Sequence, residues 1–176
     1  HFDHCGGGVK ENDGKYELTF PRATYWSNKE HWQWAVEPNA REKASFLREN
    51  IIPMEESGHL DFIDLSAKKP FELFDIHLAN GHTDKQMLPK IKYKEHTIVF
   101  MADLLPSVGH IPLPYVMGYD TRPLITLEEK GKFLAEAADN NYILFLEHDP
   151  LHECCTVKHT EKGVRLDRTF PLSEIL

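Results

Sequence analysis

The chain has 176 residues, of which 41% are hydrophobic and 11% aromatic, enough for an ordinary folded core and too many for disorder. Its formal net charge of −8 disfavours nucleic acid as a partner, since no basic stripe offsets the acidic excess. No stretch approaches the roughly 18 apolar residues of a membrane span, so we expect no membrane partner. Three cysteines make no disulfide framework, which indicates either a reducing compartment or simple burial of the cysteines. The length suits one domain over residues 1–176.

The chain opens on His1-Phe2-Asp3-His4, which matches the end of an H-x-H-x-D-H metal motif whose first His lies before the chain start. On a tight loop, one His can face one metal while the next Asp-His pair turns toward a second metal. Imidazole nitrogens and carboxylate oxygens are ligands that zinc accepts, and that manganese, iron or cobalt accept to a lesser degree. For this tetrapeptide taken alone, a solvated terminus is the alternative.

The hydrophobic patterns predict strands with interspersed helices, which fit sheets flanked by helices. Asn28 is a fair N-cap for a helix that Pro38 ends, and Thr126 begins an S/T-x-x-E capping box that opens another helix. We expect turns near Lys69-Pro70 and Asp84-Lys85. The expected helices cover 29–36, 40–50 and 126–140, and the expected strands cover 16–20, 23–26, several segments within 60–93, 97–103, 142–148, 156–158 and 164–166.

Candidate ligands follow three of the apolar segments. His82 comes after an alternating segment, Asp103 ends a run that begins at Thr97, and His148 ends a run that begins at Tyr142. A run of four to six apolar residues is typical of a strand buried on both faces, and a polar residue at its end lies at the rim of the sheet. One His or Asp after a strand is usually structural. Four such sites in order, counting the first motif, favour a metal centre.

Tyr25, Trp26, Trp32 and Trp34 form an aromatic cluster that suits either a core or a substrate pocket. Aromatic residues at helical spacing more often belong to a core. Trp32 and Trp34 lie two residues apart and cannot share one helix face. We therefore expect one of them to face solvent, a pocket or a partner subunit.

Together these motifs resemble the metallo-β-lactamase superfamily in its binuclear hydrolase form. The resemblance covers essentially the whole chain and rests on His1-x-Asp3-His4, Gly81-His82-Thr83, Asp103 and His148. It implies an α/β (α+β) fold, a four-layer αββα sandwich whose N-terminal strands are absent from this chain. The segment after Asp103 is similar to the branch with lactonase-like and organophosphate-hydrolase-like members.

The resemblance implies two divalent metal ions, with zinc expected first and manganese, iron or cobalt as alternatives. His1 and His82 would hold the first metal together with the absent upstream His, and Asp103 would bridge both metals. Each ligating His should be steered by an acceptor on its other ring nitrogen. The full implied ligand set is His1, Asp3, His4, His82, Asp103 and His148.

The implied function is a metal-dependent hydrolase that uses a metal-bridging hydroxide to cleave a lactone, ester or related acyl bond in a small-molecule substrate. Asp3 would orient the hydroxide and pass its proton to the leaving oxygen, and Asp103 would hold the metal pair together. His110, Tyr115 and Tyr119 are candidate donors to the oxyanion, because they follow Asp103 closely. A phosphodiester hydrolase on the same scaffold and a non-catalytic metal-binding relative are the alternatives.

Two departures from the family pattern are visible. The first His and the N-terminal strands are not in this sequence, so we expect a processed or truncated chain, and a homodimer or an association with the missing N-terminal segment. Asp84-Lys85-Gln86 stands where many relatives have a second Gly, so Lys85 is expected to alter the turn or to place a cation near the site. We expect a cytoplasmic location, with export left open by the chain start.

Overall fold

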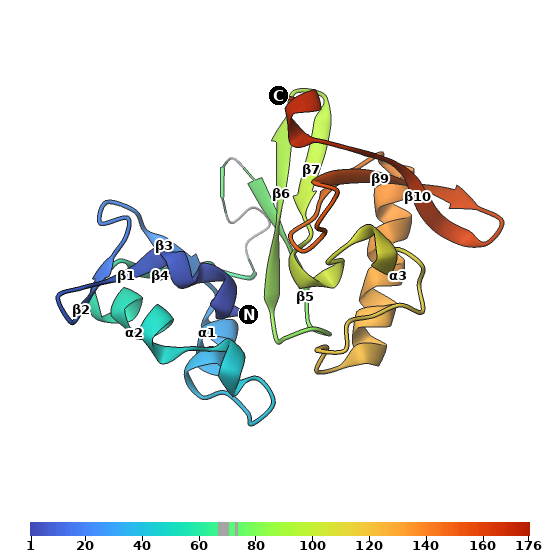
Figure 1. Cartoon of the computed structure of the whole chain (residues 1–176). Coiled ribbons are helices and arrows are strands. Elements are labelled where there is room, and N and C mark those ends of the chain that lie inside the picture. The colour runs from blue at the N-terminus through green and yellow to red at the C-terminus, as the bar shows by residue number, and fades with distance from the viewer. Residues whose placement is uncertain (67–70, 73) are drawn as a thin grey trace. The chain divides into compact units, whose positions relative to one another are not determined.

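The computed structural model describes residues 1–66, 71–72 and 74–176 (Figure 1). It divides into two compact units, His1–Lys68 and Lys69–Leu176, and each unit is described by itself. The turn expected near Lys69-Pro70 lies outside the described residues. The single domain expected over residues 1–176 stays a prediction. Among the described helices, none has the length and apolar character that crossing a lipid bilayer requires.

The first unit is built from short elements. β1 and β2 form an antiparallel hairpin, whereas β3 and β4 pair in parallel. The hairpin turns at Asp13-Gly14, where both residues have a positive φ, the backbone that a two-residue Asp-Gly turn adopts. The strands expected over 16–20 and 23–26 are confirmed, with ends shifted by one or two residues. The elements are β1 (Val9–Asn12), β2 (Lys15–Leu18), β3 (Tyr25–Ser27), α1 (Lys29–Val36), α2 (Arg48–Glu56) and β4 (Leu60–Phe62), with 3₁₀ turns at Phe2–Gly8 and Lys43–Ser45.

α1 covers the residues that the sequence predicted. Asn28 Oδ1 accepts a hydrogen bond from the backbone N–H of His31 at 2.8 Å, which satisfies one of the donors left open at the start of the helix. Both helices of this unit bury apolar side chains in a small core, against which Phe2 packs. The buried members of this core are Trp32, Ala35, Phe46, Ile51 and Met54.

The helix expected over 40–50 is wrong. Asn39 Oδ1 accepts hydrogen bonds from the backbone N–H groups of Arg41 and Glu42, at 2.9 and 3.1 Å. These are the bonds of a helix N-cap, so a helical turn does begin at this point. The turn ends as a short 3₁₀ helix, because Phe46 and Leu47 leave the helical backbone with ψ angles of 71° and 118°. The α-helix begins only at Arg48, so it covers just the end of the expected range.

The second unit contains a six-stranded mixed sheet with the strand order β10-β9-β8-β7-β6-β5. β7 and β8 run parallel and are joined through α3, whereas every other neighbouring pair is antiparallel. A mixed sheet with helices is the fold class that the sequence predicted. The elements are β5 (Phe74–Ala79), β6 (Gln86–Tyr93), β7 (His96–Phe100), α3 (Pro123–Asp139), β8 (Ile143–Phe145), β9 (Cys154–Thr160) and β10 (Gly163–Phe170).

α3 begins three residues before the capping box that the sequence suggested. Pro123 occupies the first turn, where its fixed φ suits a helix and its missing N–H is not needed. Arg122 is the N-cap, and its carbonyl accepts hydrogen bonds from the N–H groups of Ile125 and Thr126. Thr126 is therefore a buried residue inside the helix rather than its cap. The expected end near Asn140 is confirmed.

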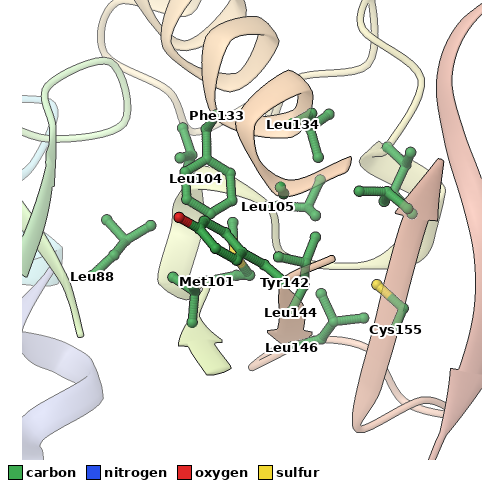
Figure 2. Close-up of a cluster of buried hydrophobic side chains, with 14 of the residues drawn as sticks. Leu88, Met101, Leu104, Leu105, Phe133, Leu134, Tyr142, Leu144, Leu146 and Cys155 are labelled. Atoms are coloured by element: carbon green, nitrogen blue, oxygen red, sulfur yellow. The ribbon is translucent and has the colours of Figure 1, made fainter. Parts of the chain in front are cut away.

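The core of the second unit lies between α3 and the sheet. Figure 2 shows Phe133 of α3 with Leu144 and Cys155 of the sheet in one buried cluster. Side chains alternate along a strand, so the preceding residues of the two strands, Ile143 and Cys154, join a second buried cluster on the opposite face. Both faces of β8 are thus buried, as its continuous apolar run predicted, and the start of β9 is buried on both faces as well.

Candidate metal centre

Three predicted ligands in the second unit stand in loops at one edge of its sheet. His82 follows β5, Asp103 lies in the 3₁₀ turn Ala102–Leu104 after β7, and His148 follows β8. β5 is antiparallel to β6, which is antiparallel to β7, and β7 is parallel to β8. The three strands therefore run in the same direction, and the loops after them meet at the same edge.

The carboxylate of Asp103 lies between two imidazoles. Its Oδ2 is 3.2 Å from His82 Nε2, and its Oδ1 is 3.1 Å from His148 Nε2. The side chains of Asp103 and His82 are 2% and 3% exposed. A buried carboxylate is costly unless a positive charge or a hydrogen-bond donor balances it. Two imidazoles and one carboxylate form a donor set that fits zinc, so these residues fit the implied metal.

The segment after Tyr119 holds His82 in place. Asp120 Oδ1 lies 3.0 Å from His82 Nδ1 and is fully buried, so it is the acceptor expected on the second ring nitrogen. The N–H of Thr121 donates to the carbonyl of His82 at 3.2 Å, and the N–H of Arg122 donates to the carbonyl of Gly81 at 2.8 Å. Ring and backbone are thus fixed by three consecutive residues that the sequence did not assign to the site.

The surroundings of His82 favour a positive charge at this position. Burial would lower the pKa of His82, but its hydrogen bonds to the carboxylates of Asp103 and Asp120 and the charge of Asp103 together raise that pKa above its ordinary value. A cation is therefore favoured by the two buried carboxylates on either side of the ring. This electrostatic preference agrees with the donor set.

The turn after His82 carries the departure from the family pattern. Lys85 has a φ of 54°, a left-handed backbone that glycine adopts most readily. Its N–H donates to Asn80 Oδ1 at 3.3 Å, and the neighbouring Asp84 forms an ion pair with Arg122 at 2.8 Å. Lys85 thus keeps the backbone conformation for which a glycine would be the usual choice.

The remaining predicted ligands lie in the first unit. His1 Nε2 is 3.0 Å from Glu42 Oε1, and Trp34 Nε1 donates to Glu42 Oε2 at 2.8 Å. Asp3 and His4 are partly exposed neighbours, with Asp3 Oδ1 3.7 Å from His4 Nε2. Glu42 was not predicted as a site residue. The meeting of this set with His82, Asp103 and His148 in one binuclear centre stays a prediction.

The candidate oxyanion donors lie between Asp103 and α3. His110 ends the 3₁₀ turn Val108–His110, with its Nδ1 2.8 Å from Ser107 Oγ. Burial, followed by the charge of Lys130, lowers the pKa of His110. The side chains of Tyr115 and Tyr119 are largely exposed. A role for these three residues in catalysis stays a prediction.

An apolar pocket of about 390 Å³ lies within the first unit. Phe2, His4 and Trp26 line it, together with Trp32 and Met54. Trp32 is 5% exposed and belongs to the core, whereas Trp26 is 45% exposed. The aromatic cluster therefore contributes to both the core and the wall of the pocket, and Trp32 belongs to both.

No known protein-family model matches the chain. Several solved structures share its fold, including the following three. A probable metal-dependent hydrolase from Staphylococcus aureus matches with a TM-score of 0.74 and 21% identity, over 87% of this chain and 53% of that structure. The hydrolase AbOPH of the β-lactamase superfamily matches with a TM-score of 0.75 and 18% identity, over 94% of this chain and 60% of that structure. The dizinc quorum-quenching lactonase AidC matches with a TM-score of 0.68 and 23% identity, over 88% of this chain and 58% of that structure.

The chain has the metallo-β-lactamase fold. The resemblance drawn from the sequence motifs is therefore confirmed at the level of the fold. The chain spans between half and two thirds of the length of these structures. Among curated proteins, a yeast (Saccharomyces cerevisiae) amidophosphoribosyltransferase is 24% identical over 120 residues, which are 68% of this chain and 22% of that protein.

Proposed function

We propose that this metallo-β-lactamase fold belongs to a binuclear metal-dependent hydrolase that cleaves a lactone, ester or related acyl bond in a small molecule. The observation that carries the proposal is Asp103, whose two oxygens face one imidazole each, at 3.2 Å for His82 and 3.1 Å for His148. A ligand shared between two cations needs one accessible oxygen for each of them. The probable metal-dependent hydrolase and the dizinc lactonase with the same fold support the proposal.

Two bound cations, with zinc first and manganese, iron or cobalt as alternatives, would polarise a carbonyl and bring the pKa of a bound water toward neutrality. The chain contributes the positions of the ligands. Asp120 accepts from His82 Nδ1 and leaves Nε2 directed at Asp103. Asp3, partly exposed and next to His4, would take up a proton and release it to the leaving oxygen. His110, Tyr115 and Tyr119 would donate to the oxyanion.

The pocket in the first unit supports a substrate with an apolar group. Its volume of about 390 Å³ is in the range of small-molecule sites, and its wall includes the rings of Phe2 and Trp26. His4 lines the same pocket and is one of the predicted ligands. We propose that an acyl or aryl group occupies it.

Three measurements on the purified full chain test the proposal. Elemental analysis should find at least one equivalent of a transition metal, and lactones and aryl esters should be turned over faster than bis(p-nitrophenyl) phosphate. If the phosphodiester were turned over faster, the chain would be assigned as a phosphodiester hydrolase and the acyl-bond assignment would be wrong. Full metal occupancy without turnover of either class would favour a non-catalytic relative, and no bound metal would contradict the centre altogether.

A further inference from the structure

The side chain of Glu129, on α3, binds the backbone directly before His82. Glu129 Oε1 and Oε2 accept from the N–H of Asn80 at 3.0 and 2.9 Å, and Oε2 also accepts from the N–H of Gly81 at 3.0 Å. The side-chain amide of Asn80 donates to Oε1 at 3.0 Å as well. One carboxylate thus collects three N–H groups of the loop on which His82 stands. Hydrogen bonds to a charged acceptor are stronger than those between neutral groups.

The next residue of the helix, Lys130, binds a different loop. It donates to backbone carbonyl groups, whereas Glu129 accepts from backbone N–H groups. Its Nζ donates to the carbonyl oxygens of His110 at 2.8 Å, Tyr115 at 2.5 Å and Pro112 at 3.4 Å. An ammonium group has three N–H donors, and three carbonyls surround this one. Lys130 is only 1% exposed, and burial lowers its pKa to about 8. A charged group buried in this way fixes the segment that carries the candidate oxyanion donors.

A close backbone contact completes the attachment of the His82 loop to α3. A Cβ added to Gly81 would lie 2.2 Å from the backbone nitrogen and from Oγ1 of Thr126. No side chain fits there, so Gly81 is the residue that allows the loop to touch the helix. Thr126 lies three and four residues before Glu129 and Lys130, which places all three on neighbouring positions of the helix surface.

We propose that Glu129 and Lys130 are a pair of positioning residues, the first fixing the His82 loop through its N–H groups and the second fixing the 110–115 segment through its carbonyls. The inference rests on the proposed function in one respect, because it treats His82 as a ligand and the 110–119 segment as the source of oxyanion donors. The attachment itself requires no metal. One helix thereby sets the positions of two loops that are distant in sequence.

The test is hydrogen exchange on the full chain without added metal, with Glu129→Gln and Lys130→Met as variants. Glu128→Gln and Lys132→Met are the matched controls, because Glu128 and Lys132 are exposed and pair with each other. Glu129→Gln should speed exchange at Asn80 and Gly81 by about tenfold or more, as expected for the loss of hydrogen bonds to a charged group. It should leave the 110–115 amides unchanged.

Lys130→Met should produce the reverse pattern. The amides of His110, Ile111 and Tyr115, which are hydrogen-bonded in turns, should exchange about tenfold faster, because the charged donor to their segment is lost. Lys130→Gln, which keeps two N–H donors, should give an intermediate rate. If Lys130→Met does not fold, Lys130→Gln and Glu129→Gln still decide the matter.

Equal acceleration throughout the unit, or none in either variant, would overturn the proposal, because a merely structural role gives no loop-specific pattern. A zinc titration separates this outcome from the fate of the proposed function. Glu129→Gln should bind zinc more weakly than wild type, with Glu128→Gln unchanged. If wild type binds no zinc while the exchange patterns appear as expected, the positioning pair stands and the proposed function fails.

Discussion

Asp120→Asn is the change that most directly probes how His82 is held. Asp120 is fully buried, and its Oδ1 lies 3.0 Å from His82 Nδ1. Asn is nearly the same size but carries no charge, so the ring keeps its space and loses its anionic acceptor. Changing such an acceptor behind a ligating His lowers metal affinity by about 10- to 100-fold. This corresponds to about 1.4–2.7 kcal/mol of binding free energy.

The assay is a zinc titration against a competing chelator, at a pH above the ordinary pKa of His. Asp167→Asn is the control, because Asp167 is a partly exposed carboxylate that pairs with Lys158 on the surface. We expect the control to match wild type and Asp120→Asn to bind zinc at least tenfold more weakly. Equal zinc affinity in Asp120→Asn and wild type would refute the reasoning that Asp120 orients a metal ligand.

Three further predictions concern stability. Gly81→Ala should lower the free energy of unfolding by about 1–3 kcal/mol in thermal or urea unfolding, because the added Cβ overlaps the backbone of Thr126; an unchanged value would contradict the close contact. Asn28→Ala should lower the free energy of unfolding by about 1 kcal/mol, measured in the same way. Asn28→Ser should keep most of the wild-type stability, since both Asn and Ser cap helices well. Burial lowers the pKa of Lys130 from 10.5 to about 8. Between pH 8 and pH 10.5, the unfolded chain therefore binds more protons than the folded chain. Wild type should therefore gain stability relative to Lys130→Met as the pH rises through this window, and a constant difference would argue against the lowered pKa.

The positions of His82, Asp103 and His148 at the ends of strands could be predicted because two local signals coincide there. Apolar runs mark buried strands, and polar residues after them mark the rim of a sheet. Asp103 and His148 illustrate this, since parallel pairing of β7 and β8 brings the ends of their runs together. The expectation that His82 is a metal ligand predicted an acceptor on its second nitrogen, but it could not say which residue.

The partners of the site residues were missed because they are distant in sequence. Asp120 is 38 residues from His82, Glu129 is 49 residues from Asn80, and Glu42 is 41 residues from His1. Their local sequence gives little sign of these contacts. Glu42 has one usable signal, the Asn-x-x-Glu spacing from Asn39, whose side chain accepts from the N–H of Glu42.

The helix errors have local causes. Over 40–50, apolar spacing suggested a helix, but the backbone of Phe46 and Leu47 is not helical, with ψ angles of 71° and 118°. At Thr126, a capping-box pattern was present, but Pro123 had already begun the helix. In both segments, the backbone conformation of one or two residues sets the boundary, and hydrophobic periodicity does not report it.

The most direct test of the central claim is the zinc stoichiometry of wild type and Asp103→Asn, with Asp167→Asn as the control. The account predicts two equivalents of zinc in wild type and in the control. It predicts one equivalent or none in Asp103→Asn, with acyl-bond hydrolysis reduced by several orders of magnitude, because Asp103 is the carboxylate between the two imidazoles. Retention of both zinc ions and of turnover in Asp103→Asn would contradict the account at its centre.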